Sequence, residues 1–372
     1  MTIHRKSFCK SRKKGTTPFK QIIAAITVAL TIAMSGCSND TTPPLDLQNA
    51  EMDVTLFRGA ANNSYFEVYF NAKPTPGAEQ VEVDQQLIDL RPERDVTLNV
   101  EIYNPGGTIP LIVTPGGNGD TRGFGGFARN LAAAAPDIKV IIYDRRNLGL
   151  SQITFGREPQ MIEEGEDLHI LIKRLGVAPV TLYGMSSGGR SNLILASRYP
   201  EDIAALMIAP LTGGPLAAAR LSEEYFFKYL LDQKLTTMQH ISASPITSMQ
   251  DLSKTPLWSA YLERNSEENR QRFFDADISE FLAAMKTSGE HLQATNHQTA
   301  LGMTDQALAE LKITETLLLH HTTYTDYLHP VTNTRAATTL IPNSSFRFAP
   351  YLPDLLEVVL PFVRKHSANS ES

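Results

Sequence analysis

The spacing of apolar residues changes near residue 109 and predicts a different kind of strand on each side. Before this point, short β-rich runs at 54–59, 65–70 and 97–105 are separated by Gly, Pro and Asn, which is typical of antiparallel strands. After it come continuous apolar runs, as expected of strands that are buried on both faces. These runs are IPLIVTP (109–115), KVIIYD (139–144), VTLYGM (180–185) and ALMIAP (205–210).

Helical periodicity lies between the buried runs, at 126–136, 161–176 and 189–200. Strands that alternate with helices predict βαβ units and a mostly parallel sheet, with the antiparallel strands extending one edge. Residues 213–312 interrupt this alternation with helical patterns only, and it resumes from 313 to 366. We interpret the interruption as a helical lid, inserted over the carboxyl ends of the strands, where open α/β sheets bind ligands.

The first 36 residues have the pattern of a secretory signal. Seven Lys or Arg and no acid precede the 13-residue apolar stretch 22–34, which is shorter than the ~20 residues that span a bilayer. The following MSGC resembles a bacterial lipobox, which implies cleavage before Cys37 and lipidation of that residue. The residue after Cys37 is Ser38, and a serine at this position resembles Gram-negative lipoproteins of the outer membrane. An alternative is a soluble secreted protein in which Cys37 has no such role.

Cleavage at this point leaves 336 residues and changes the formal net charge from −6 to −13. A strongly acidic chain argues against nucleic acid and against an anionic membrane face as partners, so we expect membrane contact through the lipid only. Cys9 is lost with the signal, which leaves Cys37 alone. An intrachain disulfide and a thiolate zinc site are therefore excluded. Residues 37–50 are Ser-, Asn-, Asp- and Pro-containing and predict a flexible tether.

The stretch GMSSGG fits the pattern G-x-S-x-G with Gly184, Ser186 and Gly188, between a predicted strand and a predicted helix. A serine on such a sharp turn needs glycines two positions away on either side, so that its hydroxyl stands clear of the sheet. The helix that follows directs its amides toward a developing oxyanion, and the N–H of Ser187 is one donor. Ser186 is therefore the candidate nucleophile.

The motifs TPGGNG (114–119), YDRRNLGLSQ (143–152) and GMSSGG follow one another as in the α/β-hydrolase family, and most resemble its proline iminopeptidase-like members. The resemblance implies an α/β-hydrolase fold: a mostly parallel central sheet flanked by helices, with an inserted helical lid. It also implies that Gly117 supplies the second oxyanion donor, and that Asp144, Arg145 and Ser151 brace the loop beside the serine. Pro115 and Asn147 stand where the family usually has histidine and glycine.

The acid and base of such a site follow the serine in the chain. Asp326, after the strand ETLLLHH (315–321), is the candidate acid. The loop after the last strand, where the histidine is expected, contains none, and His366 is expected to lie beyond the last helix in a disordered tail. Three alternatives remain open: His329 in the loop of Asp326 acts as base, His320 or His321 does, or no base exists.

The leading hypothesis is a lipid-anchored serine hydrolase of small esters or peptide-like amides that uses Ser186, Asp326 and His329. This chemistry requires no metal and no organic cofactor. The alternative is a catalytically degenerate protein of the same fold that binds a ligand or a partner. The predicted organisation is a signal peptide, a tether, two parts of a hydrolase core around the lid, and a tail: 1–36, 37–50, 51–212, 213–312, 313–366 and 367–372.

Replacing Cys37 with Ala is expected to move the protein from the membrane to the soluble fraction, because the site of lipidation is lost. Fractionation of cells that express each form, followed by immunoblotting, measures this. Replacing Ser7 with Ala inside the signal is the matched control and leaves the protein in the membrane fraction. A Cys37→Ala protein that stays membrane-bound and uncut contradicts the lipobox.

Overall fold

The computed structural model describes twelve stretches of the chain, separated by gaps. They are residues 68–69, 72–116, 119–154, 158, 160–211, 246–254, 262, 267–280, 283, 303–321, 329 and 331–367. The predicted signal, the tether and most of the predicted lid lie outside these residues.

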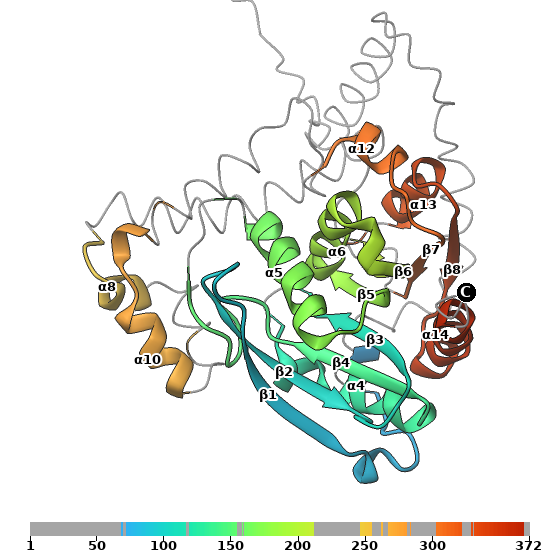
Figure 1. The fold of residues 1–372 in the computed structure, drawn as a ribbon, viewed down its shortest axis with the longest axis horizontal. Helices are drawn as coiled ribbons and strands as arrows, with labels where there is room; N and C mark the ends of the chain where they lie inside the picture. Colours follow the sequence, from blue (N-terminus) through green and yellow to red (C-terminus); the bar gives the residue numbers. More distant parts are fainter. Residues whose placement is uncertain are drawn as a thin grey trace, which may run out of the picture. The chain divides into compact units, whose positions relative to one another are not determined.

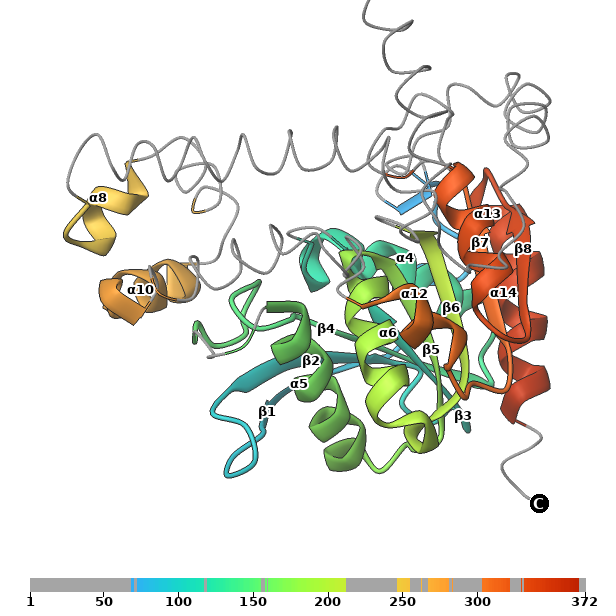
Figure 2. The same cartoon turned by 90° about the horizontal axis from the view of Figure 1, so that it is seen from above.

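The described residues form an eight-stranded sheet in the order β1-β2-β4-β3-β5-β6-β7-β8. β1 pairs antiparallel with β2, and β2 with β4, whereas every pair from β4 to β8 is parallel. Figure 2 shows β1 and β2 at one end of the sheet and β7 and β8 at the other. The strands are Val83–Asp89, Thr97–Tyr103, Ile109–Thr114, Ile138–Tyr143, Val180–Ser186, Ile203–Leu211, Thr316–His320 and Ser344–Phe348. The predicted mostly parallel sheet with an antiparallel edge is confirmed.

Helices cover both faces of this sheet (Figure 1). α5 (Gln160–Leu175), α6 (Ser187–Arg198) and α13 (Val331–Leu340) pack on one face, and α4 (Thr121–Ala134) and α14 (Leu352–Ser367) pack on the other. Neighbouring strand residues alternate between the two cores: Leu182 belongs to the first core and Tyr183 to the second. A strand buried on both faces must be apolar throughout, which explains the continuous apolar runs.

The remaining helices with described bounds are short. η2 (Ala78–Gln80) and η3 (Pro200–Asp202) are 3-10 turns, and α8 (Met249–Ser253), α10 (Glu267–Asp275) and α12 (Asp305–Ala309) come from the predicted lid region. α8 and α10 share an apolar cluster of their own. α12 instead contributes Leu308 to the core beneath α5 and α6.

Two expectations for individual segments were wrong. Residues 68 and 69, in the run predicted as a strand at 65–70, are helical. Val68 and Tyr69 are both buried in the same core, whereas neighbouring residues of a strand point to opposite faces. The sequence pattern also missed β1, because its residues VDQQLID are mostly exposed and lack an apolar alternation.

His366 was expected in a disordered tail, but it lies inside α14 and is buried. Its Nε2 is 3.1 Å from Oε2 of Glu315, which also pairs with Lys365. Burial lowers the pKa of His366, and the Glu315 carboxylate opposes that effect. These contacts tie the last turn of α14 to the residue before β7, so the helix continues to Ser367.

Candidate active site

Ser186 lies at the sharp turn where β5 ends and α6 begins. Its backbone angles are φ 51° and ψ −119°, in a region that residues with a side chain rarely adopt. Such strain persists only where the surrounding structure holds it, and it is typical of functional sites. The geometry agrees with the nucleophile turn that the G-x-S-x-G pattern predicts.

The glycines around this turn are required by close backbone contacts. A Cβ at Gly188 would lie 2.4 Å from the Thr114 carbonyl oxygen, and a Cβ at Gly184 would lie 2.6 Å from the Cα of Gly189. Gly116 approaches from the loop after β3: a Cβ there would lie 2.7 Å from the Cβ of Ser186. The sequence motif identified the first two glycines, while the close approach of Gly116 became visible only in the structure.

Asn192, in the second helical turn of α6, connects the segments that surround Ser186. It is fully buried and its amide is 2.9 Å from the Thr114 hydroxyl. With the amide oriented to donate to Thr114 and to the Gly188 carbonyl, its oxygen accepts from the Gly184 N–H at 3.3 Å. One side chain therefore links the end of β3 to both glycines of the motif.

The structure brings His329 to Ser186. His329 Nε2 is 2.9 Å from Ser186 Oγ, and both side chains are buried, with exposed fractions of 7% and 9%. This distance lies within the range that proton transfer between a nucleophile and its base requires. For Ser186 to donate, Nε2 must be unprotonated, so the neutral ring carries its proton on Nδ1.

The other candidate bases lie elsewhere. His320 ends β7 and its ring is 6.0 Å from that of Phe348, while the rings of His321 and Tyr69 form a T-shaped contact at 5.0 Å. Asp326 and Gly117 fall outside the described residues, so their roles stay predictions. Ser187 is the first residue of α6, which places the positive end of the helix dipole beside Ser186.

Asp144 organises the loop that follows β4. Its buried carboxylate accepts hydrogen bonds from the Thr121 N–H at 2.5 Å, the Leu150 N–H at 2.8 Å and the Asn99 side chain at 2.9 Å. Ser151 Oγ donates to the Asp144 carbonyl at 2.6 Å and accepts from the Asn99 N–H. Burial raises the pKa of Asp144 to about 6, against the lowering effect of these donors.

Asn147, in the same loop, has a φ of 68°. This left-handed conformation favours glycine, and asparagine is among the side chains that tolerate it best. The Asn147 side-chain oxygen also accepts from the Thr154 N–H at 2.8 Å. The position where the resembled family usually has glycine therefore keeps the backbone conformation that glycine permits.

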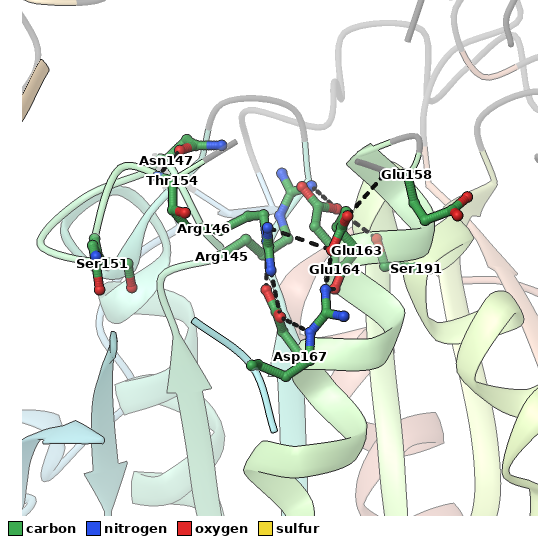
Figure 3. Close-up of polar contacts among 12 residues, drawn as sticks. Arg145, Arg146, Asn147, Ser151, Thr154, Glu158, Glu163, Glu164, Asp167 and Ser191 are labelled. Atoms are coloured by element: carbon green, nitrogen blue, oxygen red, sulfur yellow. Dashed lines mark hydrogen bonds and ion pairs between the residues drawn. The ribbon is translucent and has the colours of Figure 1, made fainter. Parts of the chain in front are cut away.

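A buried network of charges ties this loop to α5 and α6 (Figure 3). Arg145 Nη1 donates to Glu164 Oε2 at 2.7 Å, and Ser191 Oγ on α6 donates to the same oxygen at 2.6 Å. Arg146 forms two hydrogen bonds of 2.6 Å with Asp167, which also accepts from Arg94.

From the sequence we expected Arg145 to brace this loop, but the sequence did not identify the acidic residues of the network, Glu163, Glu164 and Asp167. Glu163 and Asp167 are four residues apart on α5, a spacing that puts both on one helix face. This spacing was the signal that the sequence offered.

Burial lowers the pKa of Arg190, on the first turns of α6, to about 10, while the charge of Glu164 raises it. Arg190 therefore keeps its charge at neutral pH.

Within the described part of the chain, no three His, Cys, Asp or Glu side chains are grouped so as to hold a metal ion. The helices described here include none that combines the length and the apolar character needed to cross a membrane.

A sequence profile for the alpha/beta hydrolase fold matches residues 109–238, which include β3, β4, β5, β6 and the serine turn. The chain has the α/β-hydrolase fold. A comparison with curated protein sequences finds no match.

Solved structures with this fold resemble the chain at low sequence identity. A membrane phospholipase A is 16% identical, with 93% of this chain and 99% of that chain covered and a TM-score of 0.51. A protein from Acinetobacter baumannii that is named as a putative lipase is 15% identical, with 90% and 100% covered and a TM-score of 0.50. A bromoperoxidase from Bacillus anthracis is 19% identical, with 76% and 100% covered and a TM-score of 0.50. These similarities concern the α/β-hydrolase fold alone.

Replacing Gly188 with Ala is expected to destabilise the protein by about 1–3 kcal/mol, the usual range for overpacking a filled site. The added Cβ meets the backbone of Thr114 and Pro115, which cannot move without disturbing β3. Chemical denaturation measures the change. Gly126→Ala, on α4, is the control: nothing lies within 4 Å of its Cβ, so it is expected to be neutral or slightly stabilising. Equal stabilities for the two variants contradict the tight turn.

The raised pKa of Asp144 predicts a pH-dependent stability. Between pH 4 and 6 the folded protein keeps a proton on Asp144 that the unfolded chain releases, so its contribution to stability falls as the pH rises. A shift from 3.8 to about 6 corresponds to about 3 kcal/mol. In Asp144→Asn we expect this part of the pH dependence to be absent. Chemical denaturation of both proteins at several pH values measures the free energy of unfolding.

Asp137→Asn is the control for this experiment. Arg364 holds the pKa of the exposed Asp137 below its usual value, so the carboxylate stabilises the folded state only once it is ionised. Asp137 therefore contributes a small rise in stability with rising pH, opposite in sign to the contribution of Asp144. We expect Asp137→Asn to remove that small rise. Parallel pH profiles for the wild type and Asp144→Asn contradict the raised pKa.

Proposed function

We propose that the chain is a serine hydrolase that cleaves a small ester or amide through an acyl-enzyme on Ser186. The observation that carries the proposal is the 2.9 Å distance between Ser186 Oγ and His329 Nε2 at a strained turn. A hydroxyl is a weak nucleophile until a neighbouring base accepts its proton as it attacks. Ser186 and His329 have the mutual geometry for this step.

In the first half of the reaction, Ser186 Oγ attacks the substrate carbonyl carbon and His329 Nε2 accepts the hydroxyl proton. The oxyanion is stabilised by the Ser187 amide at the start of α6 and, in this proposal, by the Gly117 amide. Collapse of the intermediate expels the alcohol or amine, which takes the proton from His329. Water, deprotonated by His329, then hydrolyses the acyl-enzyme and restores the serine.

Asp326 is proposed as the acid that orients the His329 ring through its Nδ1–H. It precedes His329 by three residues in the chain, and a carboxylate there stabilises the imidazolium that forms during attack. It is unusual for the acid and the base of such a site to come from a single loop of the chain. These sites are nevertheless defined by geometry rather than by sequence position.

The cellular setting proposed here is the outer membrane of a Gram-negative cell, with the protein attached through lipid on Cys37. The support is the lipobox pattern and the polar tether that follows it. Solved structures of similar fold include a membrane phospholipase A and a protein named as a putative lipase, and these names favour an ester as the first test substrate. An amide substrate follows from the resemblance to iminopeptidases.

Replacing His329 with Ala is expected to lower kcat on an activated ester by at least ~10²-fold, the lower end for loss of a general base. Ser186→Ala is expected to lower kcat at least as far, and the double variant is expected to lose hardly more than either single variant, because members of one catalytic unit are not additive. Asp326→Asn is expected to lower kcat by leaving the imidazole in the wrong tautomer. Steady-state kinetics of the wild type and the four variants measure these effects.

His366→Gln is the matched control, because His366 on α14 is also buried but contacts Glu315, the residue before β7. It is expected to keep wild-type kcat. Full activity in His329→Ala excludes this base and moves the test to His320 and His321. A wild-type protein that turns over no ester or amide favours a protein that only binds its ligand.

A further inference from the structure

Tyr69 comes from the segment before β1 and is buried in the core beneath α4 and α14, with an exposed fraction of 2%. Its ring meets that of Phe127 edge-on at 4.8 Å and that of Phe124 at 5.6 Å. These contacts hold the Tyr69 ring in one position, so that its hydroxyl meets defined partners.

The hydroxyl of Tyr69 joins two strands of the sheet. It donates to the Ala209 carbonyl at 2.9 Å, and its oxygen is 2.8 Å from the Tyr183 hydroxyl, which is therefore the donor in that pair. Tyr183 lies on β5, three residues before Ser186. Burial raises the pKa of Tyr183, so its hydroxyl stays protonated and able to donate.

Ala209 lies on β6 where the pairing with β5 changes register. Gly184 pairs with Ile208, but Ser186 pairs with Leu211, so β6 has one residue more than β5 between these pairs. The carbonyl that accepts from Tyr69 belongs to this irregular stretch. Tyr69 thus supports the sheet at the point where the strand bends into the serine turn.

The rings of Tyr69 and His321 form a T-shaped contact, with ring centroids 5.0 Å apart and planes at 71°. His321 directly follows β7 and is fully buried. From there the chain reaches His329 eight residues later. One side chain therefore contacts the strand that carries Ser186 and the start of the segment that carries His329.

We propose that Tyr69 is a positioning residue that holds the strand of Ser186 and the segment of His329 at the mutual distance their proton transfer needs. This inference rests on the proposed function. In this proposal a residue that precedes β1 contributes to the geometry of the active site. Displacement of a reacting group by about 1 Å can lower a rate by about 10²-fold, so a support of this kind acts on kcat.

The test compares Tyr69→Leu, Tyr69→Phe and Tyr183→Phe with wild type, in the full-length protein. The rate of labelling of Ser186 by a fluorophosphonate, and kcat and KM on an activated ester, are measured. We expect labelling and kcat to fall by about 10²-fold in Tyr69→Leu, with KM nearly unchanged, because positioning affects the reacting atoms rather than ground-state binding. Tyr69→Phe keeps the ring contacts and is expected to recover about tenfold of that loss.

Tyr103→Phe is the matched control. Tyr103 is equally buried and its hydroxyl donates to Glu101, but it lies on β2, which does not pair with β5. It is expected to label at the wild-type rate. If Tyr69→Leu does not fold, Tyr69→Phe decides the question, and its labelling must be slower than that of Tyr103→Phe. Adding Tyr183→Phe to Tyr69→Phe must slow labelling little further, because the hydrogen bond between Tyr69 and Tyr183 is already lost in Tyr69→Phe.

The failures of this inference and of the proposed function are distinguishable. Wild-type protein that labels at Ser186 while folded Tyr69 variants label at the same rate overturns the positioning role and leaves the hydrolase intact. Equal losses of kcat in Tyr69→Phe and Tyr103→Phe also overturn it, because they indicate a general loss of packing. Wild-type protein that does not label at Ser186 contradicts the proposed function and, with it, this inference.

Discussion

The rest of the site depends on one backbone constraint, the turn at Ser186. A serine at φ 51° costs of order 1–3 kcal/mol and needs a surrounding structure that leaves no alternative. Backbone atoms approach the turn so closely that Gly184, Gly188 and Gly116 have no room for a Cβ. Because the chain cannot relax here, the hydroxyl of Ser186 stays directed out of the sheet and toward His329.

The charges buried beside the turn have a structural purpose that follows from the same constraint. Burying ion pairs is at best weakly stabilising, because each charge loses its hydration. The pairing of Arg145 with Glu164 instead fixes positions: Glu164 also accepts from Ser191, five residues after Ser186. The loop after β4, α5 and α6 are thereby held in one arrangement around the start of α6, where the oxyanion is proposed to bind.

The sequence predicted most of the sheet and the serine turn because both depend on local patterns. Strands buried on both faces are continuously apolar, and a strained turn needs glycines at fixed spacing. Contacts between distant segments left no such pattern. Tyr69 lies 114 residues before Tyr183, and an alternating run around it suits a strand as well as the buried helical residues observed. His329 was one of three alternatives, since spacing alone does not determine the path of a loop.

The central claim is that His329 activates Ser186 for covalent catalysis. The most direct measurement is rapid quenching of the wild-type protein during turnover of an activated ester, followed by peptide mapping. The account predicts an acyl group on Ser186 that forms and decays at catalytically competent rates, and no such accumulation on this time scale in His329→Ala. An acyl group on Ser187 or another residue, or equal accumulation without His329, would contradict the account.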